Sequence, residues 1–369
     1  MKKGGLFSDK IDTTLFICVI LLAISGIVTV HSAAASLSGH HRYVAVQASA
    51  YAIGLFAMIC IIFFRYTYLK NLRHFIFFAG VGLLCAVLAF GKLTNGTQGW
   101  FEIGPISLQP SEIAKLCFII TLSAHLSAVK EKISRAKTLF LLFLHLLCYL
   151  APVLLQPDFG TASVFLVIFV TEVFFAGVPV LYMFASGGIL AAISPVIWHF
   201  LAPFQRQRIK TFFKPENDPL GSGYHIIQSK IAIGSGQIIG RGYMKGPQTQ
   251  FGYLPEKQTD FAFSVIGEEF GFIGTIFITA LLFITVYRCF DNARANTHDP
   301  FGELLCVGVG AMLMFHTVEN IGMCIGIMPI TGIPLPFISY GGSSVVTCFS
   351  AVGLVQSVAM RRRSVKFNI

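Results

Sequence analysis

The chain carries little charge for its length. Of its 369 residues only 12% are charged, against roughly 25% in an average soluble protein. Acidic residues are the scarcer sign, with 17 Asp and Glu against 27 Lys and Arg, for a formal net charge of +10. So few ionisable side chains cannot cover a globule of this size with hydrated groups. A soluble domain is therefore excluded.

The cysteines lack the spacing of a metal or redox motif. There are nine, none forms a C-x-x-C pair, and most lie inside apolar stretches. We interpret them as small apolar residues of a core rather than as disulfides or zinc ligands.

Long apolar runs dominate the sequence instead, and hydrophobic residues make up 55% of the chain. A helix needs about 20 such residues to cross a bilayer. Ten segments qualify, and they cover about 12–32, 45–64, 74–91, 111–128, 138–156, 161–177, 180–203, 261–287, 302–328 and 340–360. The sequence thus predicts an all-α integral membrane protein. It would be a polytopic bundle of about ten transmembrane helices forming one domain over 1–369, with a large extracytoplasmic loop between the seventh and eighth helices.

The cations are distributed as a membrane topology requires. With the N-terminus inside, 16 of the 27 Lys and Arg fall in cytoplasmic segments and two in the short outer loops. This satisfies the positive-inside rule and predicts that both termini are cytoplasmic. Cations placed in short clusters between apolar runs also argue against a nucleic-acid partner and make membrane lipids the expected surroundings.

The predicted outer loop, 204–260, departs from that distribution because it holds eight cations. Their concentration favours an anionic ligand at the outer face. A solvated loop beside anionic headgroups is the alternative. Within it, 224–233 has apolar residues at helical spacing and predicts an amphipathic or re-entrant segment.

Ionisable residues inside spans are costly and require a chemical reason. Glu112 and Lys115 are three residues apart, so they share one face of a helix and can pair. They form either a structural ion pair between helices or the wall of a polar cavity in which Lys115 meets an anion. Glu172, Glu268, Glu269 and Glu319 are further acidic residues within predicted spans.

Two aspartates lie at the outer ends of predicted spans. Asp158 can cap the sixth span or place its carboxylate in an outward cavity. Asp260 closes the cationic loop at the mouth of the eighth span, with Glu256 four residues earlier and Lys257 between them. An interfacial or capping carboxylate is the alternative, but we favour Asp260 as the catalytic residue.

The last predicted outer loop, 328–344, is apolar yet contains three prolines. Such a chain cannot form a regular helix and must be buried against protein or line a cavity. The hydroxyls of Ser339 and Ser343 could bind a polar head group there. A purely structural plug fits equally well.

Several long motifs in order resemble the SEDS family of bacterial cell-wall polymerases (shape, elongation, division and sporulation). The motifs are Gln109-Pro-Ser-Glu-Ile-Ala-Lys115, Gln156-Pro-Asp-Phe-Gly-Thr161, Gly221-Ser-Gly-Tyr-His-Ile-Ile-Gln228, Leu254-Pro-Glu-Lys-Gln-Thr-Asp260 and Pro334-Leu-Pro-Phe-Ile-Ser-Tyr-Gly-Gly-Ser343. The chain looks more like the RodA-like elongation branch than the FtsW-like division branch. Glu319 is not part of the pattern and is given no role.

The resemblance implies a peptidoglycan glycosyltransferase that joins lipid II units into glycan strands at the outer face of the bacterial cytoplasmic (inner) membrane. It implies lipid II, the nascent strand and a class B penicillin-binding protein as partners. Asp260 would be a base or a metal ligand, with a divalent cation (Mg²⁺ or Mn²⁺) as the conceivable cofactor. Lys115 and Arg206 or Arg208 would hold the pyrophosphate, and Glu112 and Asp158 would organise the cavity. The other expected substrate-binding residues are Glu256, Lys257, Ser339 and Ser343.

Two other functions remain open on the sequence alone. A lipid II flippase would also need a polytopic bundle with buried charges, although it should need polar residues along its full depth. A scaffold of the cell-wall synthesis complex would tolerate substitution of Asp260.

Overall fold

The computed structural model describes residues 11–94, 97–103, 106–182, 188, 206, 210–214, 218 and 221–361. In chain order its elements are α1 (Thr13–Ala34), α2 (His40–Phe63), α3 (Thr67–Asn71), α4 (Arg73–Phe90), β1 (Lys92–Thr94), β2 (Thr97–Ile103), β3 (Ile106–Leu108), α5 (Pro110–Val129), the 3₁₀ turn η1 (Lys130–Lys132), α6 (Ala136–Leu155), α7 (Phe159–Phe175), α10 (Ser222–Ser235), α11 (Pro247–Gln250), α12 (Ala262–Arg294), α13 (Pro300–Ile325) and α14 (Gly342–Met360).

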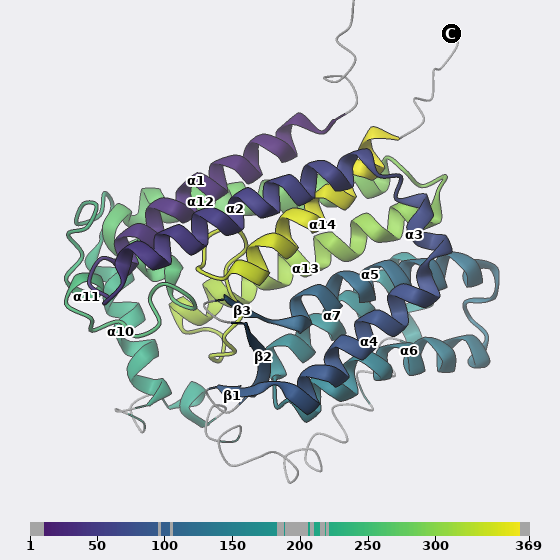
Figure 1. The fold of residues 1–369 in the computed structure, drawn as a ribbon, viewed down its shortest axis with the longest axis horizontal. Helices are drawn as coiled ribbons and strands as arrows, with labels where there is room; N and C mark the ends of the chain where they lie inside the picture. The colour runs from purple at the N-terminus through teal and green to yellow at the C-terminus, as the bar shows by residue number, and fades with distance from the viewer. Residues whose placement is uncertain are drawn as a thin grey trace, which may run out of the picture.

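The long helices lie side by side along one axis, as membrane spans must (Figure 1). Eight of the described helices are long and apolar enough to cross a membrane, and α7 is a shorter apolar helix of 17 residues. These nine match nine of the ten predicted spans, so the polytopic helical fold is confirmed. The predicted seventh span, 180–203, lies almost wholly outside the described residues.

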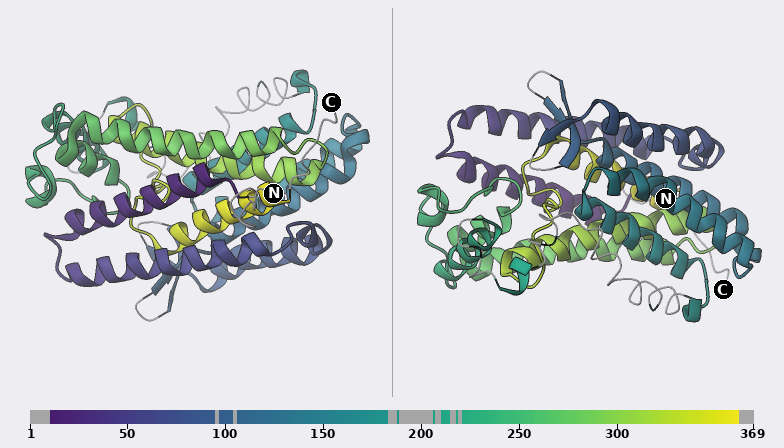
Figure 2. Two further views of the ribbon diagram at one scale, coloured as in Figure 1. Left: turned by 90° about the horizontal axis from the view of Figure 1, so that it is seen from above. Right: turned by 90° about the horizontal axis from the view of Figure 1, so that it is seen from below.

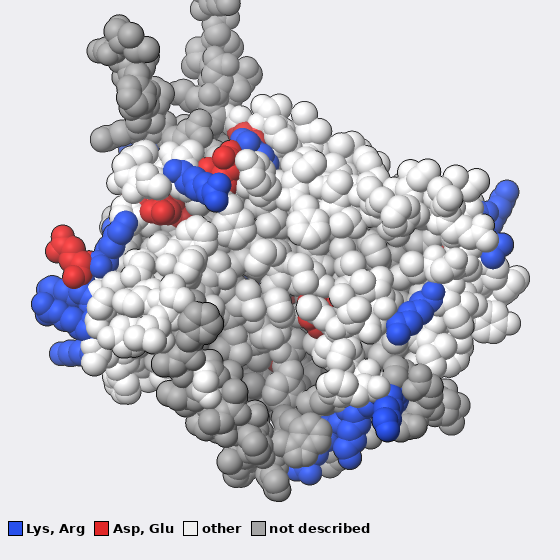
Figure 3. Space-filling view, turned by 180° about the vertical axis from the view of Figure 1, so that it is seen from behind, with Lys and Arg blue, Asp and Glu red and all other residues white. Residues whose placement is uncertain are grey.

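The centre of the bundle is α13, which contacts α5, α7, α12 and α14, while α2 packs along α14 and α1 along α12. Because neighbours surround α13 on several sides, its buried residues include polar ones such as His316, Glu319 and Asn320. By contrast α4 and α6 lie at the periphery and expose large apolar side chains such as Phe75, Phe78, Phe140 and Phe143. The face seen in Figure 3, on the other side of the molecule from α4, is uncharged across most of its middle, with Lys and Arg mainly toward its edges.

The first and last spans are joined at one end of the bundle. The backbone N–H of Asp12 donates to Oε1 of Gln356 (2.9 Å), and Nε2 of Gln356 donates to the carbonyl of Asp12 (2.8 Å). The Asp12 carboxylate also accepts from Nε of Arg288 (2.9 Å) and Nδ2 of Asn292 (2.6 Å). These contacts tie α1 to both α12 and α14.

The opposite end carries the small elements. Figure 2 shows α10 and α11 gathered there in both views. The segment predicted as amphipathic or re-entrant is the helix α10. A three-stranded antiparallel sheet, β1-β2-β3, precedes α5 and was not predicted. It places Gln109 and Pro110 so that α5 begins with proline at its first turn, where the missing N–H costs nothing.

The helix α12 is interrupted at Gly271, whose φ is 65°. The interruption frees backbone groups that a nearby loop satisfies: Phe272 N–H donates to the carbonyl of Gln237 (2.8 Å) and Ile273 N–H to that of Ile238 (3.1 Å). A side chain at Gly271 would collide with the backbone N of Gly240, 2.3 Å from its Cβ position. The kink is thus possible because the segment between α10 and α11 supplies the missing hydrogen bonds.

Candidate functional site

The predicted ion pair exists and is fully buried. Nζ of Lys115 lies 2.8 Å from Oε1 of Glu112, and the two side chains are 2% and 3% exposed. Both project from the first two turns of α5, where the three-residue spacing sets them on one face. Nζ of Lys115 also lies 3.1 Å from Nε2 of His316 on α13. Lys115 therefore links α5 to α13. Two charges buried away from water are stable only when they are paired and hydrogen-bonded, as these are.

A cavity adjoins this pair. Its volume is about 30 Å³, and the residues that line it come from α5, α7, α13 and the loop before α14: Gln109, Glu112, Lys115, Asp158, Thr161, Val164, His316, Thr331, Gly332, Ile333 and Pro334. Lys115 thus pairs with Glu112 within α5, contacts α13 through His316, and lines a polar cavity with Glu112. A space of this size holds one or two water molecules. A pyrophosphate would need it to open.

Asp158 caps a helix and lies at the cavity. Its Oδ1 accepts from the backbone N–H of Thr161 (2.9 Å) and its Oδ2 from the hydroxyl of Thr161 (2.8 Å), so it is the N-cap of α7. It lines the cavity as well. The cap holds the carboxylate in place at the cavity wall.

Asp260 lies beside the same cavity. Its carboxylate atom Oδ2 is 3.6 Å from the position that a Cβ of Gly332 would occupy, and Gly332 is a wall residue. Residue 332 is a glycine, at a φ of 78°, so no side chain stands between Asp260 and this part of the wall. Glu112, Lys115 and Asp158 thus line one cavity and Asp260 lies next to its wall, although the four residues come from three separate segments of chain.

Two loop residues predicted to bind substrate lie differently from each other. Glu256 is exposed and its Oε2 accepts from Thr259. Lys257 is buried, donating to the hydroxyl of Ser36 and to the carbonyl of Thr249. Burial lowers the pKa of Lys257, and the carboxylates of Glu268 and Glu269 oppose that shift. Lys257 thus anchors the loop to α1 and α11, and the cavity described above does not include it.

The two serines are held in the loop before α14. Oγ of Ser339 accepts from the backbone N–H of Leu335 (2.9 Å) and is buried. Oγ of Ser343 accepts from the N–H of Gln109 (3.1 Å), next to the cavity. The loop is irregular and buried as predicted, with Phe337 in the left-handed region at φ 61°. Its carbonyl accepts from the hydroxyl of Tyr51 (2.6 Å), which holds this strained residue.

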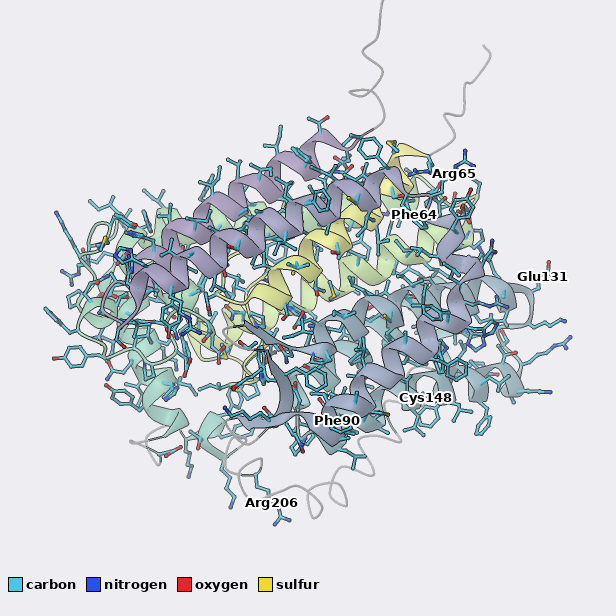
Figure 4. The ribbon with its side chains drawn as sticks, viewed as in Figure 1. Phe64, Arg65, Phe90, Glu131, Cys148 and Arg206 are labelled. Carbon is cyan, nitrogen blue, oxygen red and sulfur yellow. The ribbon has the colours of Figure 1, made fainter. Side chains whose placement is uncertain are left out.

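The loop arginines are not part of the described cavity. Figure 4 places Arg206 at the edge of the molecule, pointing away from the helices. Arg208 lies outside the described residues.

The divalent cation has no complete set of protein ligands: in the part of the chain that the structure describes, no three His, Cys, Asp or Glu side chains are grouped to hold a metal. We derive no step through a metal.

The remaining buried acids brace the fold. Glu268 accepts from the N–H groups of Gln248 (2.7 Å) and Thr249 (2.9 Å) in α11. Glu269 accepts from the hydroxyl of Ser32 on α1 (2.5 Å). Glu172 accepts from Ser123 (2.9 Å) at the junction of α5, α7 and α13.

Sequence reasoning missed His316. A histidine in the middle of the apolar run 302–328 was a usable signal, because polar residues inside spans mark functional sites. Thr331 and Thr161 were missed too, since a threonine near a span end carries no comparable signal.

Comparison with known proteins identifies the family of the chain. Residues 12–364 match the FtsW/RodA/SpoVE family, described as cell cycle proteins. Peptidoglycan glycosyltransferase MrdB of Escherichia coli (strain K12) is 34% identical over 370 residues, covering 98% of each chain. Peptidoglycan glycosyltransferase RodA of Treponema pallidum (strain Nichols) is 31% identical over 430 residues, covering 95% of this chain and 98% of that one.

Solved structures lead to the same class. A chain from a structure described as "Structural coordination of polymerization and crosslinking by a peptidoglycan synthase complex" has a TM-score of 0.82 at 34% identity, covering 96% of this chain and 99% of that one. The rod shape determining protein RodA of Thermus thermophilus has a TM-score of 0.71 at 28% identity, covering 97% and 99%.

The chain is thus a polytopic membrane enzyme with a charged cavity at one end of its bundle. It belongs to the FtsW/RodA/SpoVE family. The predictions of a multi-pass inner-membrane peptidoglycan glycosyltransferase and of its resemblance to the elongation branch are confirmed.

Proposed function

We propose that the chain polymerises lipid II with Asp260 as the general base. The observation that carries this is the position of the Asp260 carboxylate, 3.6 Å from the Cβ position of Gly332 in the wall of the cavity that Lys115 lines. A carboxylate and a buried ammonium beside one space are what glycosyl transfer from a pyrophosphate donor needs. One accepts a proton and the other stabilises the departing anion.

The reaction balances on these groups. The acceptor sugar hydroxyl attacks the anomeric carbon of the donor, a C–O bond forms, and the hydroxyl proton passes to Asp260. The bond from that carbon to the pyrophosphate oxygen breaks, and the undecaprenyl pyrophosphate leaves as an anion. A pyrophosphate is already a stable anion, so positive charge from Lys115 replaces a general acid.

The cavity's small volume means that substrate binding must widen it. The wall segment 331–334 is irregular chain rather than helix, so it can move without breaking a ladder of helical hydrogen bonds. Arg206 and Arg208 are proposed to supply further positive charge to the pyrophosphate.

We propose that the catalytic end faces the extracytoplasmic side of the membrane and that both termini are cytoplasmic. Asp12 and Gln356 lie together at the end of the bundle opposite α10 and α11, so α1 begins and α14 ends on the same side (Figure 1). Arg65 and Glu131 lie at that same end in Figure 4. The Lys and Arg distribution makes that side the cytoplasmic one.

We further propose that a class B penicillin-binding protein crosslinks the product. Support comes from the description of the structural neighbour, in which polymerization and crosslinking are coordinated in one complex. This proposal is separate from the catalytic one and is tested by copurification.

The test is polymerisation of lipid II by the purified protein, read as glycan strands on a gel. Asp260→Asn should abolish polymer, while Glu102→Gln, an exposed carboxylate on β2, should leave it unchanged. Polymer at the parental rate from Asp260→Asn would refute the assignment.

Vesicles containing fluorescent lipid II decide the alternative, because translocation without polymer would indicate a flippase. Adding a chelator to the same assay tests the divalent cation.

A further inference from the structure

Two neighbouring side chains on α13 contact the segments that meet at Asp260. Asn320 is fully buried, and its Nδ2 donates one hydrogen bond to the carbonyl of Asp260 and another to the carbonyl of Ile333, both of 2.8 Å. Asp260 and Ile333 are 73 residues apart in the chain. A single amide group therefore joins the segment that carries the proposed base to the wall of the cavity.

The second contact comes from Glu319, which is 5% exposed. Its Oε1 accepts from the hydroxyl of Thr331 (2.9 Å). Thr331 and Ile333 flank Gly332, so α13 holds the wall on both sides of the residue that faces the Asp260 carboxylate.

The chemistry of these two positions is restrictive. Two carbonyl oxygens converge on Asn320, and only a group with two N–H bonds on one nitrogen can serve both. An isosteric Asp would instead turn an oxygen toward two carbonyl oxygens. At Glu319 the requirement is weaker, since any acceptor oxygen at that reach can bind the Thr331 hydroxyl.

We propose that Asn320 and Glu319 are positioning residues that fix the distance between the Asp260 carboxylate and the cavity wall. The inference rests on the proposed function of Asp260. Neither residue lines the cavity, so both act through Asp260 and residues 331–333 rather than on the substrate. Misplacing a catalytic group by about 1 Å can cost about 100-fold in rate.

The test compares isosteric variants in the lipid II polymerisation assay, with kcat and KM determined separately. Thr331→Val removes the hydroxyl and keeps the shape, and we expect kcat to fall about 10- to 100-fold with KM little changed. The matched control is Thr285→Val in α12, which also removes a buried hydroxyl, one that bonds only to the carbonyl of Leu281 in its own helix. It should leave kcat unchanged at a similar loss of thermal stability.

Because Thr331 itself lines the cavity, Glu319 supplies the decisive variants. Glu319→Leu should reproduce the loss of Thr331→Val, and the double variant should be no worse than either alone, since both break one contact. Glu319→Gln keeps an acceptor oxygen and should restore most of kcat. Multiplying effects in the double variant, or equal losses in the Thr285→Val control, would overturn the proposal.

Asn320→Asp is the direct test of the other contact, and we expect a loss of kcat at least as large. Should it fail to fold, the Thr331 and Glu319 variants still decide. The two proposals fail separately. An active Asp260→Asn variant would refute the proposal that Asp260 is the base. An inactive Asp260→Asn together with a fully active Thr331→Val would refute only the positioning role.

Discussion

Lys115 donates a hydrogen bond to Nε2 of His316 across 3.1 Å. An ammonium group can only donate, so Nε2 is the unprotonated ring nitrogen in this arrangement. The contact to Glu112 uses a second N–H of the same ammonium. Lys115 is thereby held by an anion and a neutral acceptor, with a third N–H for the cavity that it lines. A cation held in this way can bind an anion once the cavity has widened.

Breaking this pair should separate stability from activity. Lys115→Met leaves the Glu112 carboxylate buried without its partner, and we expect a loss of about 3–5 kcal/mol. Adding Glu112→Gln removes the uncompensated charge and should recover most of the thermal stability, but not polymerisation. Thermal unfolding in detergent and the lipid II assay measure the two effects. Recovery of activity in the double variant would show that the pair is structural only.

Asp158 can be tested in the same way because it is both a cap and a wall residue. Asp158→Asn keeps an oxygen for the N–H of Thr161, so stability should change little, whereas Asp158→Ala should cost about 0.5–2 kcal/mol. If the negative charge organises the cavity, both variants lose activity. Full activity in the stable Asp158→Asn variant would reduce this residue to a helix cap.

Helix packing at Glu172 gives a prediction that is independent of catalysis. A Cβ at Gly308 would lie 2.1 Å from Oε1 of Glu172 and 2.8 Å from Cγ2 of Ile119. Gly308→Ala should therefore destabilise the bundle by about 1–3 kcal/mol, and Glu172→Ala in that background should restore part of the loss. The control is Gly82→Ala on α4, where nothing lies within 4 Å of the new methyl group. That variant should be neutral or stabilising.

The outer loop should respond to acid through His225. Burial lowers the pKa of this α10 side chain from 6.5, and the carboxylates of Glu256 and Asp218 oppose the shift. The unfolded chain then binds a proton before the folded one does, so stability is complete above pH 6.5 and falls as the pH drops below it. His225→Gln should flatten this dependence in thermal unfolding between pH 7.5 and pH 5, a range chosen to bracket that value. The exposed His298→Gln should leave it unchanged.

The apolar pattern of the sequence was sufficient to predict the membrane spans. Each apolar run is long enough to be recognised alone, and the observed helix ends differ from the predicted ones by a few residues in most cases. The pairing of Glu112 with Lys115 was also predictable, because three residues of helix fix their relation. The start of α5 at Pro110 was predictable as well, because proline is favoured in the first turn of a helix.

Contacts between distant segments were not predictable. His316 is 201 residues from Lys115, and no periodicity shows which helices will be neighbours or how each is rotated. Lys257 illustrates the same limit, because no local pattern shows that its side chain contacts Ser36 and Thr249. Asn320 was indistinguishable from any other polar residue in a span.

The hydrogen bonds between Asp12 and Gln356 bear on the order in which this protein can assemble. Asp12 leaves the ribosome 344 residues before Gln356, the residue that completes the hydrogen bonds at this end of α1. Until Gln356 emerges, the backbone N–H and carbonyl of Asp12 lack this partner. The contacts that hold the N-terminal end of α1 are therefore completed only after α14 has been synthesised.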